Sequence, residues 1–206
     1  MPQDTGYYEV YNQDSVKLVS LLDTPIEEIT ATGVKCSDQL HDLDIIIYAT
    51  GFDAIMGSLK RIDITGKNGQ KLTEKWSNGP RTLLGIQAEG FPNFFTLIGP
   101  HNGATFCNIP RCSEQNVEWV TDLVAHMKRE NLQQVEASLD AENAWTELVD
   151  TTAEATLFSK VDSWFTGVSV NNPQKRTFML YTGGQVDYRE RCDEVAKKGY
   201  EGFVLS

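Results

Sequence analysis

Two apolar runs stand out in the pattern of hydrophobic and polar positions. Residues 43–49 (LDIIIYA) form a nearly continuous apolar run of strand length, and residues 94–98 (FFTLI) form a second one. Such runs are typical of strands that are buried on both faces, as in a parallel α/β sheet. The pattern therefore predicts two inner strands of such a sheet.

Shorter elements are predicted around the first run. Residues 16–21 and 26–29 carry β-branched and leucine residues at strand length, and Gly33 marks a turn into a further strand. Between residues 58 and 92, glycine and proline recur, so this stretch is predicted to be irregular.

The C-terminal half predicts three amphipathic helices. Ser113 is a suitable N-cap for the first, which has apolar residues on one face at Val117, Val120, Leu123, Val124 and Met127. The second is predicted over residues 140–155. The third is predicted over residues 185–198, with Gly199 as its C-terminal stop. The expected fold class is α/β with a mainly helical C-terminal extension.

Composition and charge exclude several classes of partner. The chain has 206 residues, 40% of them hydrophobic, which suits one globular domain or parts of two. Its net charge of −11 would repel phosphate backbones, so no nucleic acid is expected as a partner. No apolar run approaches the roughly 20 residues that span a bilayer, so no membrane segment is expected. The first residues lack a basic segment followed by an apolar one, which predicts no signal peptide and a cytoplasmic location.

The four cysteines are expected to be reduced, structural thiols. They form no C-x-x-C pair, and the three histidines complete no zinc pattern, so no metal site is expected. A nucleophilic role for Cys107 or Cys112 is the alternative, although no base with a recognisable partner motif lies nearby in the sequence.

Both apolar runs end in glycine turns, at Gly51 and at Gly99. Ligands of open α/β sheets bind at the carboxyl ends of strands, where glycine lets the backbone approach a flat or phosphorylated group. The start of the helix predicted near Ser113 would add free N–H groups there. The alternative is that both glycines only turn the chain. The sequence contains no G-x-G-x-x-G, G-x-x-x-x-G-K-[ST] or G-x-S-x-G motif.

An ordered series of segments resembles the Baeyer–Villiger monooxygenases over essentially the whole chain. The strand and turn DIIIYATGFDA, at residues 44–54, looks like the family's ATG turn. Other matching segments, in order, are DTGYYEVYNQDSVKLV, IDITGKNGQKLTEKWSNGPRTLLGI, GFPNFFTLIGPHNGATFCNIPRCSEQNVEWV, ATLFSKVDSWFTG, FMLYTGG and CDEVAKKGYEGFVLS. An ATG turn alone is shared by many flavoproteins, whereas the ordered series is specific.

The resemblance implies part of an FAD- and NADPH-dependent enzyme that converts ketones to esters or lactones with O2. The implied fold is a partial FAD/NAD(P)-binding, Rossmann-like domain. Residues 1–56 would form the junction between the NADPH and FAD domains, residues 57–135 the end of the FAD domain, and residues 136–206 the helical extension. The family's dinucleotide-binding glycine motifs, its fingerprint and its active arginine do not occur in this sequence. The chain is therefore expected to be a fragment that is inactive alone and binds neither cofactor tightly.

The resemblance also implies roles for individual residues. Gly51 and Asp53 would lie near the flavin–nicotinamide junction, and Asn108 and Ile109 would contact the flavin ring. Ala104, Thr105 and Phe106 match a substrate-pocket bulge. Trp164 matches a mobile-loop tryptophan whose indole N–H helps to hold NADP+. After it, residues 169–175 (SVNNPQK) depart from the family's pattern.

Two other functions stay open. An N- or S-oxygenating flavin monooxygenase would share the ATG turn, but is not expected to share the Asp-Ser-Trp loop and the Gly-Tyr-Glu-Gly-Phe ending. A non-catalytic fragment or interaction module is the alternative from a different class. Because residues 43–49 would lack their neighbouring strands, exposed edges and self-association are also expected.

Overall fold

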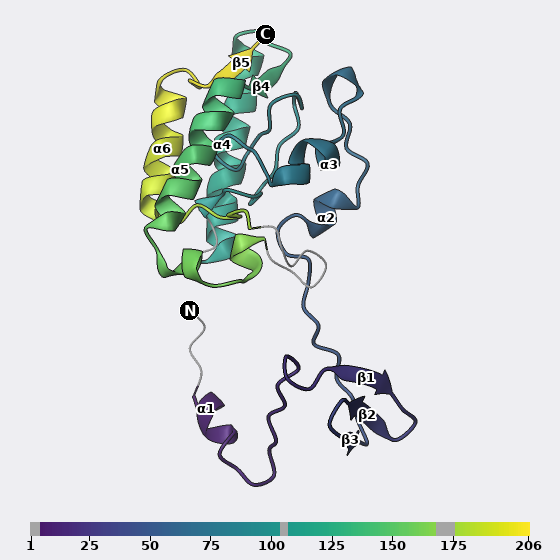
Figure 1. Cartoon of the computed structure of the whole chain (residues 1–206). Coiled ribbons are helices and arrows are strands. Elements are labelled where there is room, and N and C mark those ends of the chain that lie inside the picture. Colours follow the sequence, from purple (N-terminus) through teal and green to yellow (C-terminus); the bar gives the residue numbers. More distant parts are fainter. Residues whose placement is uncertain (1–4, 104–106, 168–175) are drawn as a thin grey trace. The chain divides into compact units, whose positions relative to one another are not determined.

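The chain divides into two compact units, residues 1–51 and residues 52–206. The computed structural model describes residues 5–103, 107–167 and 176–206 (Figure 1). No helix among these described residues combines the length and the apolar character needed to cross a bilayer.

The first unit contains a short helix and a small antiparallel sheet. Its elements are α1 (Tyr7–Val10), β1 (Ile26–Ile29), β2 (Gly33–Cys36) and β3 (Leu40–Asp42), and the strands pair in the order β1-β2-β3. A side chain at Gly33 would collide with the backbone carbonyl of His41, so the close approach of β2 and β3 requires glycine there. The predicted strand at residues 26–29 and the predicted turn into a further strand at Gly33 are confirmed.

The apolar run at residues 43–49 forms no strand, so the prediction of a buried inner strand is wrong. Ile45 is 77% exposed and Ile47 is 84% exposed. A strand needs neighbours that supply its hydrogen bonds, and the described residues place none beside this run. The expected exposure of its apolar surface is therefore confirmed. Residues 16–21 likewise form no strand, which corrects the second strand prediction in this unit.

The second unit is mainly helical. Its helical elements are α2 (Gly57–Lys60), η1 (Lys67–Gly69), α3 (Leu72–Lys75), η2 (Trp76–Asn78), α4 (Ile109–Arg129), α5 (Leu139–Glu154), η4 (Leu157–Lys160), η5 (Trp164–Thr166) and α6 (Gln185–Lys197). Its strands β4 (Val135–Ala137) and β5 (Phe203–Leu205) pair in antiparallel fashion. The short elements between residues 57 and 78 agree with the predicted irregular stretch.

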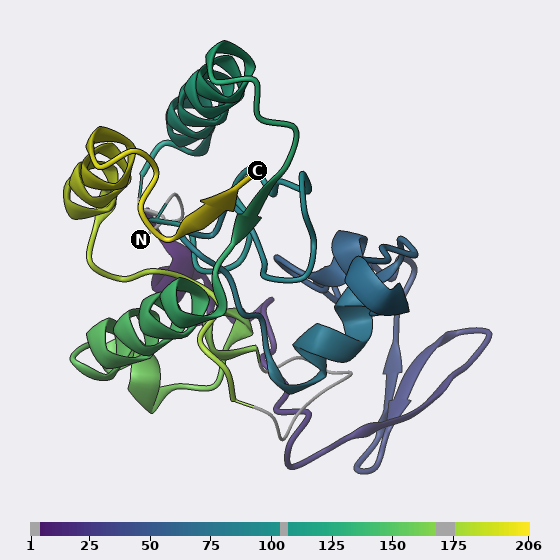
Figure 2. The same ribbon diagram turned by 90° about the horizontal axis from the view of Figure 1, so that it is seen from above.

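One core joins the irregular segment to the three long helices. Figure 2 shows α4, α5 and α6 set around β4 and β5, next to the coil that precedes α4. The buried cluster includes Leu84 and Ile86 from the coil, Leu123 from α4, Val149 from α5 and Tyr188 from α6. This cluster therefore draws on both sides of the domain boundary expected near residue 135. That division into domains stays a prediction.

Residues 94–98 form no strand either, which corrects the second prediction of a buried inner strand. Thr96 N donates to Ile86 O at 2.8 Å, as in a strand, but Ile98 has a left-handed φ of 55°. An isoleucine in that conformation ends an extended run. The strands in the described part of the chain pair only in antiparallel fashion, so the parallel sheet stays a prediction while the mixed helix and sheet content is confirmed.

Two of the three predicted helices have nearly the predicted bounds. The helix predicted at residues 140–155 is α5, whose N-cap Ser138 accepts a hydrogen bond from Ala141 N at 3.3 Å. The helix predicted at residues 185–198 is α6, and Gly199 follows it with a left-handed φ of 70°. The third, α4, begins before the predicted N-cap.

Candidate functional site

The start of α4 is set by Asn108 and Pro110. The Asn108 side-chain oxygen accepts a hydrogen bond from Arg111 N at 3.3 Å, which makes Asn108 the N-cap. Proline fits the first turn because no intrahelical N–H is needed there. The prediction that Ser113 caps this helix is therefore wrong, and Ser113 lies inside the helix. The helix N-terminus instead coincides with Asn108 and Ile109, the two residues expected to contact a flavin.

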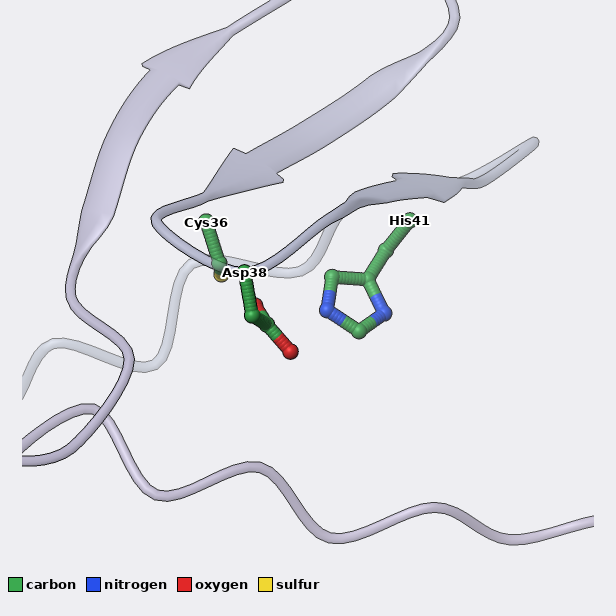
Figure 3. A group of neighbouring side chains, drawn as sticks. All are labelled: Cys36, Asp38 and His41. Atoms are coloured by element: carbon green, nitrogen blue, oxygen red, sulfur yellow. The ribbon is translucent and has the colours of Figure 1, made fainter.

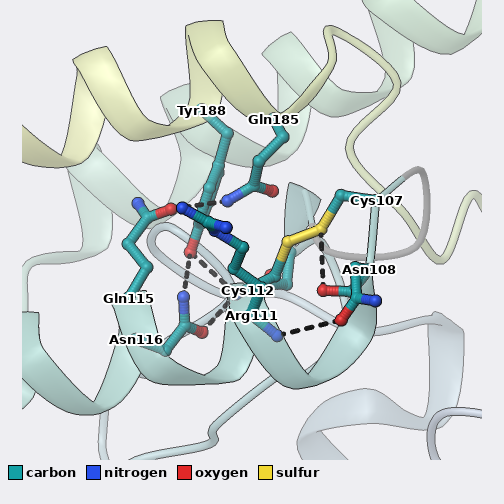
Figure 4. Close-up of a disulfide and its surroundings, with 9 residues drawn as sticks. Cys107, Asn108, Arg111, Cys112, Gln115, Asn116, Gln185 and Tyr188 are labelled. Carbon is teal, nitrogen blue, oxygen red and sulfur yellow. Dashed lines mark hydrogen bonds between the residues drawn. A yellow bond between two sulfur atoms is a disulfide. The ribbon is translucent and has the colours of Figure 1, made fainter.

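A disulfide joins Cys107 to Cys112 across this helix start (Figure 4). Because the helix begins at Ile109, Cys112 lies one turn in and its side chain reaches back to the preceding loop. The expectation of four reduced thiols is wrong for this pair, and the alternative of a nucleophilic thiol at either position loses its basis. Cys36 and Cys192 are free and buried, as expected. Burial raises the pKa of the Cys192 thiol to about 12.

A cleft of about 550 Å³ opens beside this disulfide, between the N-terminal turns of α4 and α6. It is lined by Asn108 and Arg111 from α4 and by Val186 and Arg189 from α6, among others. The Ile109 side chain, 53% exposed, lies at the same helix start. An exposed apolar side chain on a positive helix end can lie against a flat ring and favour negative charge on it.

A buried polar network holds the loop that precedes this site. Asn102 Nδ2 donates to Asn116 Oδ1 and to the Tyr188 hydroxyl, both at 2.7 Å, and Tyr188 in turn donates to the Leu84 carbonyl at 2.8 Å. Full burial raises the pKa of Tyr188 well above its ordinary value, so the hydroxyl stays protonated and able to donate. The network therefore ties the loop at residues 98–103 to both α4 and α6.

Replacing Tyr188 with phenylalanine is expected to lower the free energy of unfolding by about 1–3 kcal/mol, because Asn102 and the Leu84 carbonyl lose a buried partner. Urea denaturation followed by tryptophan fluorescence measures the change. Tyr200→Phe is the matched control, since Tyr200 is a buried ring whose hydroxyl takes no part in this network. Equal losses in both variants would contradict the role of the network.

The two glycine turns differ in what surrounds them. Gly51 has a left-handed φ of 80° and no described atom near the position of a β-carbon, so space is open there. A β-carbon at Gly99 would collide with Thr96 and the Gly85 carbonyl, so internal packing alone requires glycine at that position. Close packing therefore accounts for glycine at Gly99 without a ligand, and the role of Gly51 stays open. Asp53 accepts a hydrogen bond from Gly57 N at 3.1 Å through its backbone carbonyl, ahead of α2.

Trp164 is presented near the surface rather than in a core. It is 41% exposed and stacks on Phe165, with ring centroids 4.0 Å apart. Phe165 packs in turn against Phe158, at a centroid distance of 5.1 Å. The expected substrate-pocket residues Ala104, Thr105 and Phe106 lie outside the described residues, as do residues 169–175. The structure thus brings Asn108 and Ile109 together at one helix end and places Trp164 on a separate loop.

Sequence reasoning missed the disulfide and the Asn102–Asn116–Tyr188 network. The Asn-Ile-Pro triplet at residues 108–110 carries the signal that would have located the helix start, because asparagine favours the N-cap and proline the first turn. With that start, Cys107 and Cys112 become neighbours. No local signal marks the network, which joins residues far apart in the sequence.

Curated proteins match this chain along its whole length. The chain is 46% identical over 208 residues to the 2-oxo-Delta(3)-4,5,5-trimethylcyclopentenylacetyl-CoA monooxygenase of Pseudomonas putida, a match that covers 100% of the chain and 38% of that protein. It is 40% identical to the phenazine N-monooxygenase PhzNO1 of Lysobacter antibioticus and 39% identical to the cyclohexanone 1,2-monooxygenase of Acinetobacter sp., covering 97% and 98% of the chain. These two matches span 36% and 37% of the relatives' own length. No family model matches the chain.

Solved structures give the same relation. The OTEMO complex with FAD and NADP superposes with a TM-score of 0.91 at 46% identity, covering 100% of this chain and 37% of that one. The closed structure of a cyclohexanone monooxygenase superposes with a TM-score of 0.91 at 40% identity, covering 98% and 38%. The chain therefore spans well under half of the proteins that it matches in sequence and structure.

Proposed function

We propose that this chain, which is homologous over its whole length to part of the Baeyer–Villiger monooxygenases, supplies the flavin-side loop and helical extension of such an enzyme. The whole enzyme would use FAD, NADPH and O2 to convert ketones to esters or lactones. Bound FAD would supply the oxygen chemistry, and the protein would orient the reactants, exclude water and supply charge. The fold proposed for this part is a partial Rossmann-like, FAD/NAD(P)-binding domain.

The start of α4 is the observation that carries the proposal. Asn108 caps a 21-residue helix, and Ile109 offers an exposed apolar side chain at its positive end. In the proposal Ile109 lies against the isoalloxazine, Asn108 borders it, and the helix dipole stabilises negative charge on the reduced ring. Open space at Gly51 fits a backbone that approaches a flat ligand, with Asp53 close by in the sequence.

Trp164 is proposed to hold NADP+ through its indole N–H. Its ring is partly exposed on the short helix η5, which suits a residue that contacts a ligand when a loop closes. Closure of such a loop would exclude water from the reacting centre. Ala104, Thr105 and Phe106 are proposed to border the ketone. The division at residues 56 and 135 and the cytoplasmic location remain predictions.

A second candidate function is N-oxygenation. The phenazine N-monooxygenase PhzNO1 is 40% identical to this chain, close to the 39% of the cyclohexanone 1,2-monooxygenase. The match to that relative covers 97% of this chain, so the likeness is not confined to the ATG turn. The choice between a ketone and an aromatic nitrogen therefore rests on the substrate pocket.

A chimera tests the proposal. We would replace the matching part of the Acinetobacter cyclohexanone 1,2-monooxygenase with this chain, and expect a yellow protein that oxidises NADPH in response to a ketone. Trp164→Ala in the chimera is expected to weaken NADP+ binding about tenfold, equivalent to roughly 1.4 kcal/mol. Trp164→Phe keeps an aromatic ring but has no N–H donor, so comparing it with Trp164→Ala helps to separate ring packing from hydrogen bonding.

Each outcome of the chimera experiment is informative. A folded chimera that stays colourless would overturn the flavin-contact role and favour the non-catalytic alternative. A yellow chimera that oxygenates phenazine but no ketone would favour N-oxygenation. The isolated chain is expected to be colourless, since the sequence carries no dinucleotide-binding glycine motif, and to self-associate through residues 43–49. Sedimentation as a monodisperse monomer would contradict the latter expectation.

A further inference from the structure

Three side chains with metal-binding atoms converge where β2 turns into β3 (Figure 3). Cys36 ends β2, Asp38 lies in the turn and His41 lies in β3. Their donor atoms, a thiol sulfur, a carboxylate oxygen and a ring nitrogen, all lie within 4.8 Å of one another. None of them belongs to the proposed flavin site.

The register of the hairpin explains the convergence. His41 pairs directly with Val34 across the two strands, so their side chains share one face of the sheet. Cys36 follows Val34 by two positions and therefore points to the same face. The turn closes tightly, with Cys36 N donating to the Gln39 carbonyl at 2.9 Å, which places Asp38 over that face.

Two of the three donors are buried and otherwise unused. Cys36 is a free thiol only 3% exposed. The Nε2 atom of His41 is buried and has no hydrogen-bond partner within the described part of the chain. Leaving a buried polar atom unsatisfied costs about 1–3 kcal/mol, and coordination to a metal ion would remove that cost.

We propose that Cys36, Asp38 and His41 bind one zinc ion. Thiolate, imidazole and carboxylate together are a donor set that suits Zn²⁺, whereas Mg²⁺ and Ca²⁺ prefer oxygen alone. The two anionic ligands balance the charge of the dication. Ligand bonds of about 2.0–2.3 Å require the three donors to draw closer by roughly 1 Å, within reach of side-chain rotation at a turn. Water completes the tetrahedron, and the Cys36 thiol proton passes to solvent as the zinc–sulfur bond forms.

The ion would stabilise a unit that has little core of its own. Among residues 5–51, only Gly33 and Cys36 are buried, and the sheet has strands of four, four and three residues. A sheet this small buries little apolar surface of its own, so a bound ion would add to its stability. Binding free energy at such a site is folding free energy, so zinc would fasten β2 to β3.

Titration of the full chain with Co²⁺, after chelation and in a phosphine reductant, tests the site. We expect one equivalent to give the near-ultraviolet charge-transfer band of a thiolate–cobalt bond, and one equivalent of Zn²⁺ to bleach it. Cys36→Ser should abolish the band. His41→Gln and Asp38→Asn should each weaken Co²⁺ binding at least about tenfold, because even residues that only orient ligands cost about 10–100-fold.

Matched controls separate this site from other thiols. Cys192→Ser and His126→Gln should leave the titration unchanged, as should the double variant Cys107→Ser/Cys112→Ser. Absence of a thiolate band at one equivalent would overturn the proposal. So would a band that survives Cys36→Ser, or one that disappears when Cys107 and Cys112 are replaced.

Discussion

Replacing Lys75 with methionine is expected to lower the free energy of unfolding of the second unit by about 3–5 kcal/mol, the usual cost of removing one partner of a buried ion pair. The Lys75 ammonium lies 3.1 Å from Glu142 and 2.7 Å from Glu89, and its side chain is only 8% exposed. The Glu142 side chain is fully buried, with Arg81 at 3.8 Å as its other cation. Methionine keeps the apolar stem of lysine and removes the charge, so Glu142 would be left poorly compensated.

Equilibrium unfolding in urea measures this loss, and a surface pair supplies the control. Lys71 makes an ion pair with Asp63 at 2.7 Å, but both side chains are well exposed, so Lys71→Met should cost no more than about 1 kcal/mol. Adding Glu142→Gln to Lys75→Met should recover part of the stability, because the buried negative charge is removed with its partner. Equal losses of stability in Lys75→Met and Lys71→Met would contradict the stabilising role of the buried ion pair between Lys75 and Glu142.

Burial of Glu142 could not have been predicted from the sequence. The helix α5 was predicted at residues 140–155, close to its observed bounds, because the spacing of its apolar residues is a local signal. Glu142 nevertheless faces inward, where its carboxylate accepts a hydrogen bond from Glu89 N at 2.8 Å. The partners that make this burial tolerable, Lys75 and Glu89, lie in an irregular stretch far away in the sequence. Hydrophobic periodicity predicts which face of a helix is buried, but it cannot predict which charged residue from a distant segment will pair with a side chain on that face.

The two predicted inner strands failed for a related reason. A run such as residues 43–49 has strand character only when other strands lie beside it, and its side chains here are exposed. The extended segment at residues 94–98 stops at Ile98, whose backbone is left-handed, and it joins no ladder of strand hydrogen bonds. Apolar runs report a tendency to be buried, and long-range neighbours decide whether that burial takes the form of a sheet.

The candidate site was predicted by resemblance more than by local pattern. Asn108 and Ile109 were expected to contact the flavin, but the helix that presents them was expected to begin at Ser113. The structure moves the helix start onto these two residues, which strengthens the physical case for an anion-favouring site there. Trp164 is surface-accessible, as its expected role requires, and that role stays a prediction.

Stability is expected to fall by about 2 kcal/mol as the pH drops from 6.5 to 5, because of the buried His101. Burial lowers the pKa of His101 from 6.5 to about 4, the positive charge of Arg81 adds to the effect, and the Phe178 carbonyl opposes it. Above pH 6.5 the imidazole is neutral in both the folded and the unfolded chain. Below that pH the unfolded chain binds a proton that the folded chain refuses until about pH 4, so the loss grows steadily through this window.

The backbone of His101 prevents the ring from escaping to solvent. His101 N donates to the Met179 carbonyl at 2.7 Å, and the His101 carbonyl accepts from the Trp145 indole at 3.3 Å. Urea unfolding at pH 7, 6 and 5 measures the slope. His101→Asn should flatten it while lowering stability at pH 7, since asparagine tolerates the left-handed φ of 67° but leaves a smaller side chain. If the unfolding free energy of the parent chain changed with pH no more than that of His101→Asn, His101 would bind its proton equally well in the folded and unfolded states. The inference that the buried imidazole stays neutral would then be wrong.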